Sequence, residues 1–143
     1  MATSWTTLPH GFMGDLCPDN AESHETSELL CGIGAIARGE AYLAWARYRA
    51  VIELYQRLVL GREGTDGFIQ DGFTDCAARI AKTLAQPRYK AEKTLNTAIG
   101  LRELPDVLEC LRDGLISDEH AQLVVQRTDL LGEAARNRGV HPT

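Results

Sequence analysis

The sequence predicts an all-α protein with one long helix, followed by a helix-turn-helix-like pair and further short helices. The chain has 143 residues, of which 44% are hydrophobic and only 6% aromatic, enough for one core rich in alanine and leucine. Residues 27–60 contain no proline. The chain also has few β-branched runs and no Asn-Gly hairpin signal between alternating apolar stretches. Helices are therefore expected instead of sheet.

The composition favours a cytoplasmic protein without membrane contact. The first residues lack a basic region and a long apolar region, and no run of 18 apolar residues occurs anywhere. The cysteines at 17, 31, 76 and 110 lack the close spacing of zinc or redox motifs. We therefore expect four buried thiols in a reducing compartment, and neither a metal nor another cofactor.

The net charge of −5 is unevenly distributed along the chain. Residues 1–36 hold five acidic residues and no lysine or arginine. Residues 77–103 hold six basic and two acidic residues, a local charge of +4. The overall charge argues against unselective coating of nucleic acid, whereas the basic segment could meet phosphates.

The chain divides into an arm, a helical domain and a tail. Residues 1–26 mix proline, glycine, asparagine and acidic residues and are predicted to form an irregular N-terminal arm. Residues 27–135 are the helical domain, and residues 136–143 are a tail from which a further domain could follow. Within the domain, residues 27–60 should form one helix that stops at Gly61.

Apolar residues recur along this long helix in steps of four and three, a seven-residue repeat that keeps one seam facing a partner helix. The seam consists of Ala37, Ala41, Ala44, Tyr48, Val51, Tyr55 and Leu58. The partner is either a helix of the same domain or a helix of a second subunit in a homodimer. We favour the first alternative.

Shorter helices should follow a glycine-rich loop at residues 61–72. Thr74 is predicted to cap a helix that ends near Leu84. Proline suits the first turn of a helix, which predicts further helices at about 87–101 and 105–112.

The last helix should begin after Asp113-Gly114, which end the helix before it. Ser117 is predicted to cap this last helix, which should reach about Leu131.

Residues 74–98, with a break at "AQP", have the proportions of a helix-turn-helix. Ile80 should face inward, Ala85 should occupy the turn, and Ala91 with Leu95 should hold the second helix against the first. Most such corners bind nothing. The residues that would contact DNA are Arg79, Lys82, Arg88, Tyr89, Lys90 and Lys93. The ring of Tyr89 would either stack on DNA or cover the corner, and we favour the cover.

The spacing of Leu104-Pro105, Asp113-Gly114, Ile116-Ser117 and His120-Ala121 resembles the segment after the helix-turn-helix of ParB partition proteins. The long helix "AIARGEAYLAWARYRAVIEL", the paired helices and then "LRELPDVLECLRDGLISDEHAQLV" follow in an order that resembles another family more closely. Over roughly residues 28–135 the chain resembles actinobacterial domain of unknown function 222, also called the 13E12 repeat family. That resemblance implies a phage- or mobile-element-linked setting in which an HNH endonuclease domain follows the helical region. It implies no established activity for the helical region itself.

The chain is predicted not to be an enzyme. An HNH site needs two histidines and an asparagine in a short finger, and His10, His24, His120 and His141 are too far apart for that. We expect a non-catalytic module that binds double-stranded DNA beside a nuclease domain or partner protein. The alternative is a protein-interaction or dimerisation module that acts through the long helix, and a third is a decayed mobile-element product.

Overall fold

The computed structural model describes residues 16–62 and 68–137, and the predictions for the rest of the arm and tail, including His10 and His141, lie outside this range. The described residues contain helices and no strand, which confirms the all-α prediction. In chain order the elements are the 3-10 helix η2 (Pro18–Ser23), α1 (Thr26–Leu58), the 3-10 helix η3 (Leu60–Arg62), α2 (Phe68–Leu84), α3 (Arg88–Arg102), α4 (Pro105–Arg112) and α5 (Asp118–Asn137).

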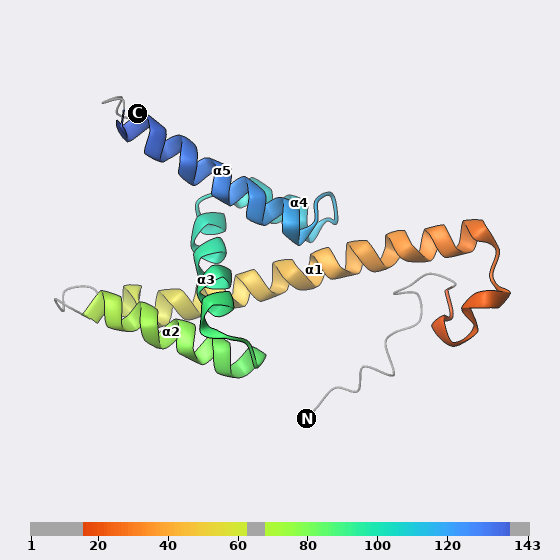
Figure 1. Ribbon diagram of the computed structural model, residues 1–143, viewed down its shortest axis with the longest axis horizontal. Helices are drawn as coiled ribbons and strands as arrows, with labels where there is room; N and C mark the ends of the chain where they lie inside the picture. The colour runs from red at the N-terminus through yellow and green to blue at the C-terminus, as the bar shows by residue number, and fades with distance from the viewer. Residues whose placement is uncertain (1–15, 63–67, 138–143) are drawn as a thin grey trace.

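Helix α1 is the scaffold of the fold, and its predicted bounds are correct to within two residues at each end. Its N-terminus is fixed by a capping box, in which the side chains of Glu25 and Glu28 each accept a hydrogen bond from the other residue's backbone. Helices α2, α3 and α4 pack on α1 from about its middle to its C-terminus, while its first turns extend beyond them (Figure 1).

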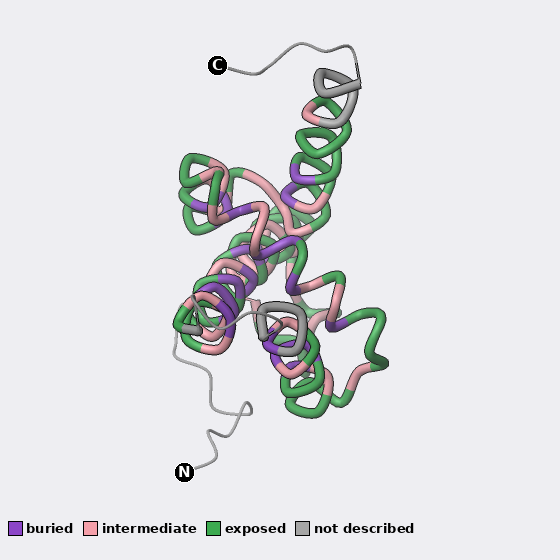
Figure 2. The backbone as a smooth tube through the Cα atoms, turned by 90° about the vertical axis from the view of Figure 1, so that its left-hand side faces the viewer, coloured by how far each residue is buried: buried purple, intermediate pink, exposed green. Residues whose placement is uncertain are grey.

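Helix α3 lies at the centre of the molecule and packs against α1, α2, α4 and α5. Its core residues Ala91, Leu95 and Leu101 are completely buried. Figure 2 shows that burial concentrates where the helices cross and falls away along the distal part of α5. None of the described helices is long and apolar enough to span a bilayer.

The seam of α1 contributes to this core. Ala41, Ala44, Tyr48 and Val51 are buried among side chains of the same chain, and the small alanines let neighbouring helices approach closely. Tyr55 and Leu58 are partly buried against the core, whereas Ala37 is exposed. The middle of the seam therefore packs within one chain, and pairing with a second subunit stays a prediction.

The predicted loop at 61–72 is wrong at its C-terminal end, because α2 begins at Phe68. Thr74 lies inside α2 and does not cap it. Gly72 serves packing instead of loop flexibility: a Cβ there would lie 2.7 Å from the carbonyl oxygen of Leu58. The missing side chain allows α2 to pack closely against the end of α1.

Two other predictions need correction. Helix α5 continues to Asn137, past the expected end near Leu131, because the good helix formers after Gly132 outweigh the cost of one glycine. The cysteines are not all buried either: Cys76 is buried, but Cys17 and Cys31 are exposed. Burial raises the pKa of the Cys76 thiol, with a smaller contribution from the charge of Asp75.

Candidate nucleic-acid interface

Helices α2 and α3 are joined by a tight turn. A residue in the left-handed conformation ends α2 there, as at the C-terminus of many helices. Ala85 adopts a left-handed conformation, with φ of 51°. The backbone N–H of Gln86 donates to the carbonyl of Ala81 at 2.9 Å, which closes the last turn of α2. Pro87, with φ of −59°, then starts α3. The predicted turn is thus present, with alanine at the position that usually favours glycine.

The two arginines among the six predicted DNA contacts are engaged within the helix pair. Arg79 forms an ion pair with Asp75 at 3.1 Å. Arg88 forms one with Glu92 at 3.4 Å and also donates to the backbone carbonyl of Thr74. The contact to Thr74 joins the start of α3 to the side of α2. Arg88 therefore links the two helices, whereas the ion pair of Arg79 lies within α2, and such exposed ion pairs contribute little stability.

The exposed side of α3 faces away from its core residues. Tyr89, Lys93 and Asn96 follow one another at spacings of four and three, so they share one face of the helix. Tyr89 is 67% exposed, so the prediction that its ring covers the corner is wrong. Asn96 was not predicted as a contact. Its spacing from Tyr89 and Lys93 was the signal that could have identified it.

A hollow of about 220 Å³ separates α3 from α1 and the start of α5. We call it the basic hollow. Its wall includes Arg47, Tyr48, Gln86, Lys90, Lys93 and Asp118. Within the described residues, no carboxylate lies within ion-pairing distance of its three cations.

The single carboxylate of the basic hollow is already hydrogen-bonded. The hydroxyl of Tyr48 donates to Oδ1 of Asp118 at 2.5 Å. Burial, followed by this hydrogen bond, raises the pKa of Tyr48 far above its ordinary value, so the hydroxyl keeps its proton. The hollow therefore carries three cations and one carboxylate, whose Oδ1 already accepts a hydrogen bond.

A second groove, of about 330 Å³, lies on the other side of Lys93, where α5 passes α3. Tyr89 and Asn96 line it together with the acidic residues Glu92 and Asp129. One cation against two carboxylates makes this groove slightly acidic. Phosphate groups are therefore better accommodated in the basic hollow than here.

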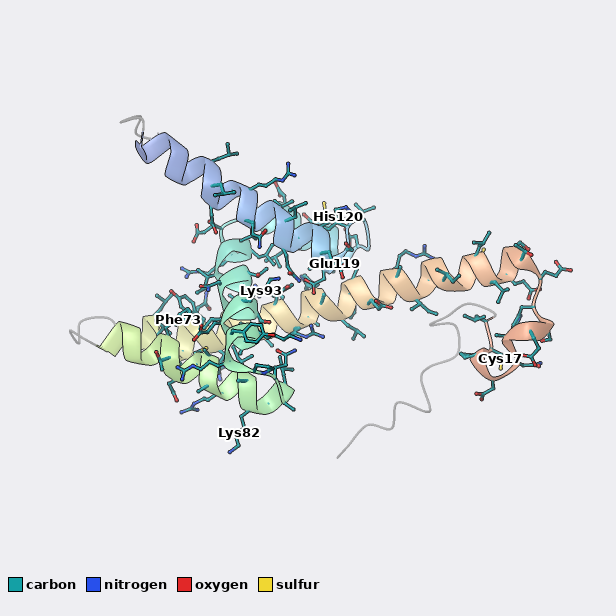
Figure 3. All side chains as sticks on the ribbon, viewed as in Figure 1. Cys17, Phe73, Lys82, Lys93, Glu119 and His120 are labelled. Carbon is teal, nitrogen blue, oxygen red and sulfur yellow. The ribbon has the colours of Figure 1, made fainter. Side chains whose placement is uncertain are left out.

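The six predicted contacts do not form one continuous patch. Lys90 and Lys93 share the basic hollow, and Tyr89 and Lys93 share the second groove. Arg79 instead lines a mainly apolar groove between α1 and α2. Lys82 projects from the end of α2 away from the other helices, whereas Lys93 lies where α3 crosses α1 (Figure 3).

His120 belongs to the cap of α5. The hydroxyl oxygen of Ser117 accepts the backbone N–H of His120 at 3.2 Å and lies 3.1 Å from its Nδ1. The predicted cap at Ser117 is thus confirmed. Across residues 16–62 and 68–137, no three histidine, cysteine or acidic side chains converge closely enough to hold a metal ion.

These features define an all-α domain in which a long scaffold helix carries a helix-turn-helix-like pair. The chain belongs to the family described as domain of unknown function (DUF222), whose model matches residues 36–140. The family predicted from the sequence is confirmed. Comparisons with curated proteins and with solved structures found no significant match.

Proposed function

We propose that this protein is a non-catalytic module that binds double-stranded DNA through the exposed N-terminal half of α3. The observation that carries the proposal is the position of Lys90 and Lys93. Both are exposed at the start of the second helix of the pair, and neither has an acidic partner within 4 Å among the described residues. In helix-turn-helix proteins the corresponding part of the second helix enters the major groove.

The other exposed residues of α3 suit this role. Lysines attract phosphates, and an exposed asparagine can form two hydrogen bonds with an adenine edge. Asn96 lies on the same face as Lys93, one turn further along. The C-terminal half of α3 is covered by α5, because a Cβ at Gly100 would lie 2.4 Å from Val125. Contact with DNA is therefore expected over the first turns of α3, up to Asn96.

We further propose that the module works beside an HNH nuclease domain or a nuclease partner. This part rests on the family resemblance alone. The helical module would then supply DNA affinity and position, and the nuclease would supply the metal site.

Hydrogen exchange of the protein with and without a mixed-sequence duplex at low salt tests the binding surface. The proposal expects slower exchange in residues 88–97, with little change in residues 26–36 at the far end of α1. Protection confined to residues 26–36, or absent throughout, would reject α3 as the binding surface. The low salt matters because the net charge of −5 weakens attraction between the protein and DNA.

A second candidate function is dimerisation through the N-terminal half of α1. Leu30 and Ile33 are 64% and 61% exposed, and they share one side of the helix. Ala37, the one seam residue that is exposed, lies one turn beyond Ile33. A second copy could cover Leu30 and Ile33 without disturbing the core, because the first turns of α1 extend beyond α2 to α5 (Figure 1).

A further inference from the structure

The basic hollow brings together cations from two helices that are far apart in the sequence. Lys90 and Lys93 come from α3, and Arg47 comes from the middle of α1. Arg47 lies outside the helix-turn-helix-like pair and was not among the predicted contacts. It lines the hollow together with Asp118 and Gln122 at the start of α5.

The hydroxyl groups that line the hollow already donate hydrogen bonds within the protein. Thr94 donates to the carbonyl of Lys90 at 3.1 Å, and Thr97 donates to the carbonyl of Lys93 at 2.9 Å. Tyr48 donates to Asp118. The strongest donors left for a ligand are thus the guanidinium and the two ammonium groups, which favour an oxyanion.

We propose that the basic hollow binds one phosphate group, with Arg47 as the residue that completes the site. The proposal rests on the proposed DNA binding and deepens it: the phosphate is a backbone phosphodiester of the duplex whose groove receives α3. A guanidinium can contact two phosphate oxygens at once, and lysines add charge without fixed geometry. The volume of about 220 Å³ leaves room for a phosphate group and water.

Gln86 also lines the hollow, but its buried Oε1 is an acceptor and would not contact a phosphate oxygen. The slightly acidic groove on the other side of Lys93 offers no comparable site, since Glu92 and Asp129 would repel a phosphate.

The test compares Arg47→Gln with Arg49→Gln. Both arginines are exposed on α1, both changes remove one positive charge, and Arg49 lies on another side of the helix. Affinity for a fluorescent duplex is measured against salt concentration, and inorganic phosphate is titrated separately by NMR of the arginine side chains. We expect Arg47→Gln to weaken duplex binding about tenfold and to reduce the salt slope by about 1, whereas Arg49→Gln changes the affinity less than about twofold.

The outcomes separate failure of the phosphate site from failure of DNA binding. Equal effects of the two variants on a duplex-binding parent overturn the hollow as a phosphate site and leave the proposed function standing. If the parent fails to bind duplex but inorganic phosphate shifts the Arg47 signal, the hollow takes a free phosphate and the DNA proposal is wrong. If neither ligand binds, both proposals are overturned.

Discussion

The hydroxyl of Tyr48 donates a hydrogen bond to Asp118 across 70 residues of sequence. This contact ties the middle of α1 to the first turn of α5 and forms one wall of the basic hollow. Tyr48 is only 3% exposed. The bond therefore combines a buried aromatic side chain with a polar partner at the edge of the candidate site.

Replacing Tyr48 with phenylalanine should lower the free energy of unfolding by about 1–2 kcal/mol, because the buried hydrogen bond to a carboxylate is lost while the ring stays in place. Urea denaturation measures this change. Tyr55→Phe is the control, since no hydrogen bond of its hydroxyl is found among the described residues and its ring under Arg102 is retained. Equal losses in the two variants would contradict a specific role for the Tyr48–Asp118 bond.

The raised pKa of Tyr48 predicts that the free energy of unfolding depends on pH. Burial and the bond to Asp118 raise the pKa of Tyr48 above its usual value of 10. Above about pH 10 the unfolded chain loses this proton while the folded chain keeps it, so stability falls as pH rises, by up to about 1.4 kcal/mol per pH unit. Tyr48→Phe lacks this contribution. The stability gap between parent and variant should narrow as the pH rises above about 10, and a constant gap would contradict the assignment.

Two helical glycines should respond to alanine in opposite directions. At Gly72 a Cβ would meet backbone of α1, which cannot move aside as a side chain can, and we expect a loss of about 1–3 kcal/mol. At Gly34 the nearest atom is the end of the Arg38 side chain at 3.5 Å. Gly34→Ala should therefore stabilise α1 by about 0.5–1 kcal/mol. Thermal melts of both variants check the prediction, and a stabilising Gly72→Ala would refute the close packing of α2 on α1.

The backbone of Ala85, in the turn between α2 and α3, is strained, and a glycine at this position would relieve the strain. Alanine in a left-handed conformation is disfavoured by about 1 kcal/mol, and glycine adopts the same φ without that cost. Ala85→Gly should therefore leave stability unchanged or raise it by up to about 1 kcal/mol, despite the greater freedom of the unfolded chain. Differential scanning calorimetry measures the effect. A marked loss of stability would show that the Ala85 methyl group packs favourably in the turn.

Dimerisation is tested separately by light scattering. If the second candidate function is correct, the parent is a dimer and Ile33→Asp converts it to a folded monomer, because a charge is introduced into the apolar contact. Leu115→Asp is the matched control, since Leu115 is 73% exposed and lies between α4 and α5. A monomeric parent at high concentration would reject this candidate, and a dimer unaffected by Ile33→Asp would place the interface elsewhere.

Local sequence signals predicted the helices well wherever a proline or a cap marks a boundary. Pro105 marks the start of α4 and Ser117 caps α5, and both boundaries were found from sequence. The start of α2 was missed because glycines usually indicate a loop. The role of Gly72 becomes visible only when the end of α1 lies beside it.

The candidate site was only partly predictable for a similar reason. The adjacent lysines of α3 could be found from local charge and spacing. The contribution of Arg47 could not, because it depends on how α1 crosses α3 and α5. Tyr89 was misjudged because nothing in its local sequence distinguishes a ring that covers a corner from one that is exposed.

The salt dependence of duplex binding by the Lys90→Glu/Lys93→Glu variant tests the central claim most directly. If α3 neutralises about 3 to 4 phosphates, the logarithm of the parent's affinity falls with the logarithm of salt concentration at a slope near −3 to −4. Arg49→Glu/Arg127→Glu is the matched control, with the same change in charge at exposed positions outside α3. Circular dichroism and melting of both variants should stay close to the parent, because exposed charges contribute little to stability.

We predict that reversing Lys90 and Lys93 flattens the slope by about 2 and that the control pair leaves it nearly unchanged. A parent that does not bind duplex at low salt would contradict the account. A genuine salt slope that survives the reversal of Lys90 and Lys93 would contradict it equally, since the helix-turn-helix-like pair would then serve packing alone.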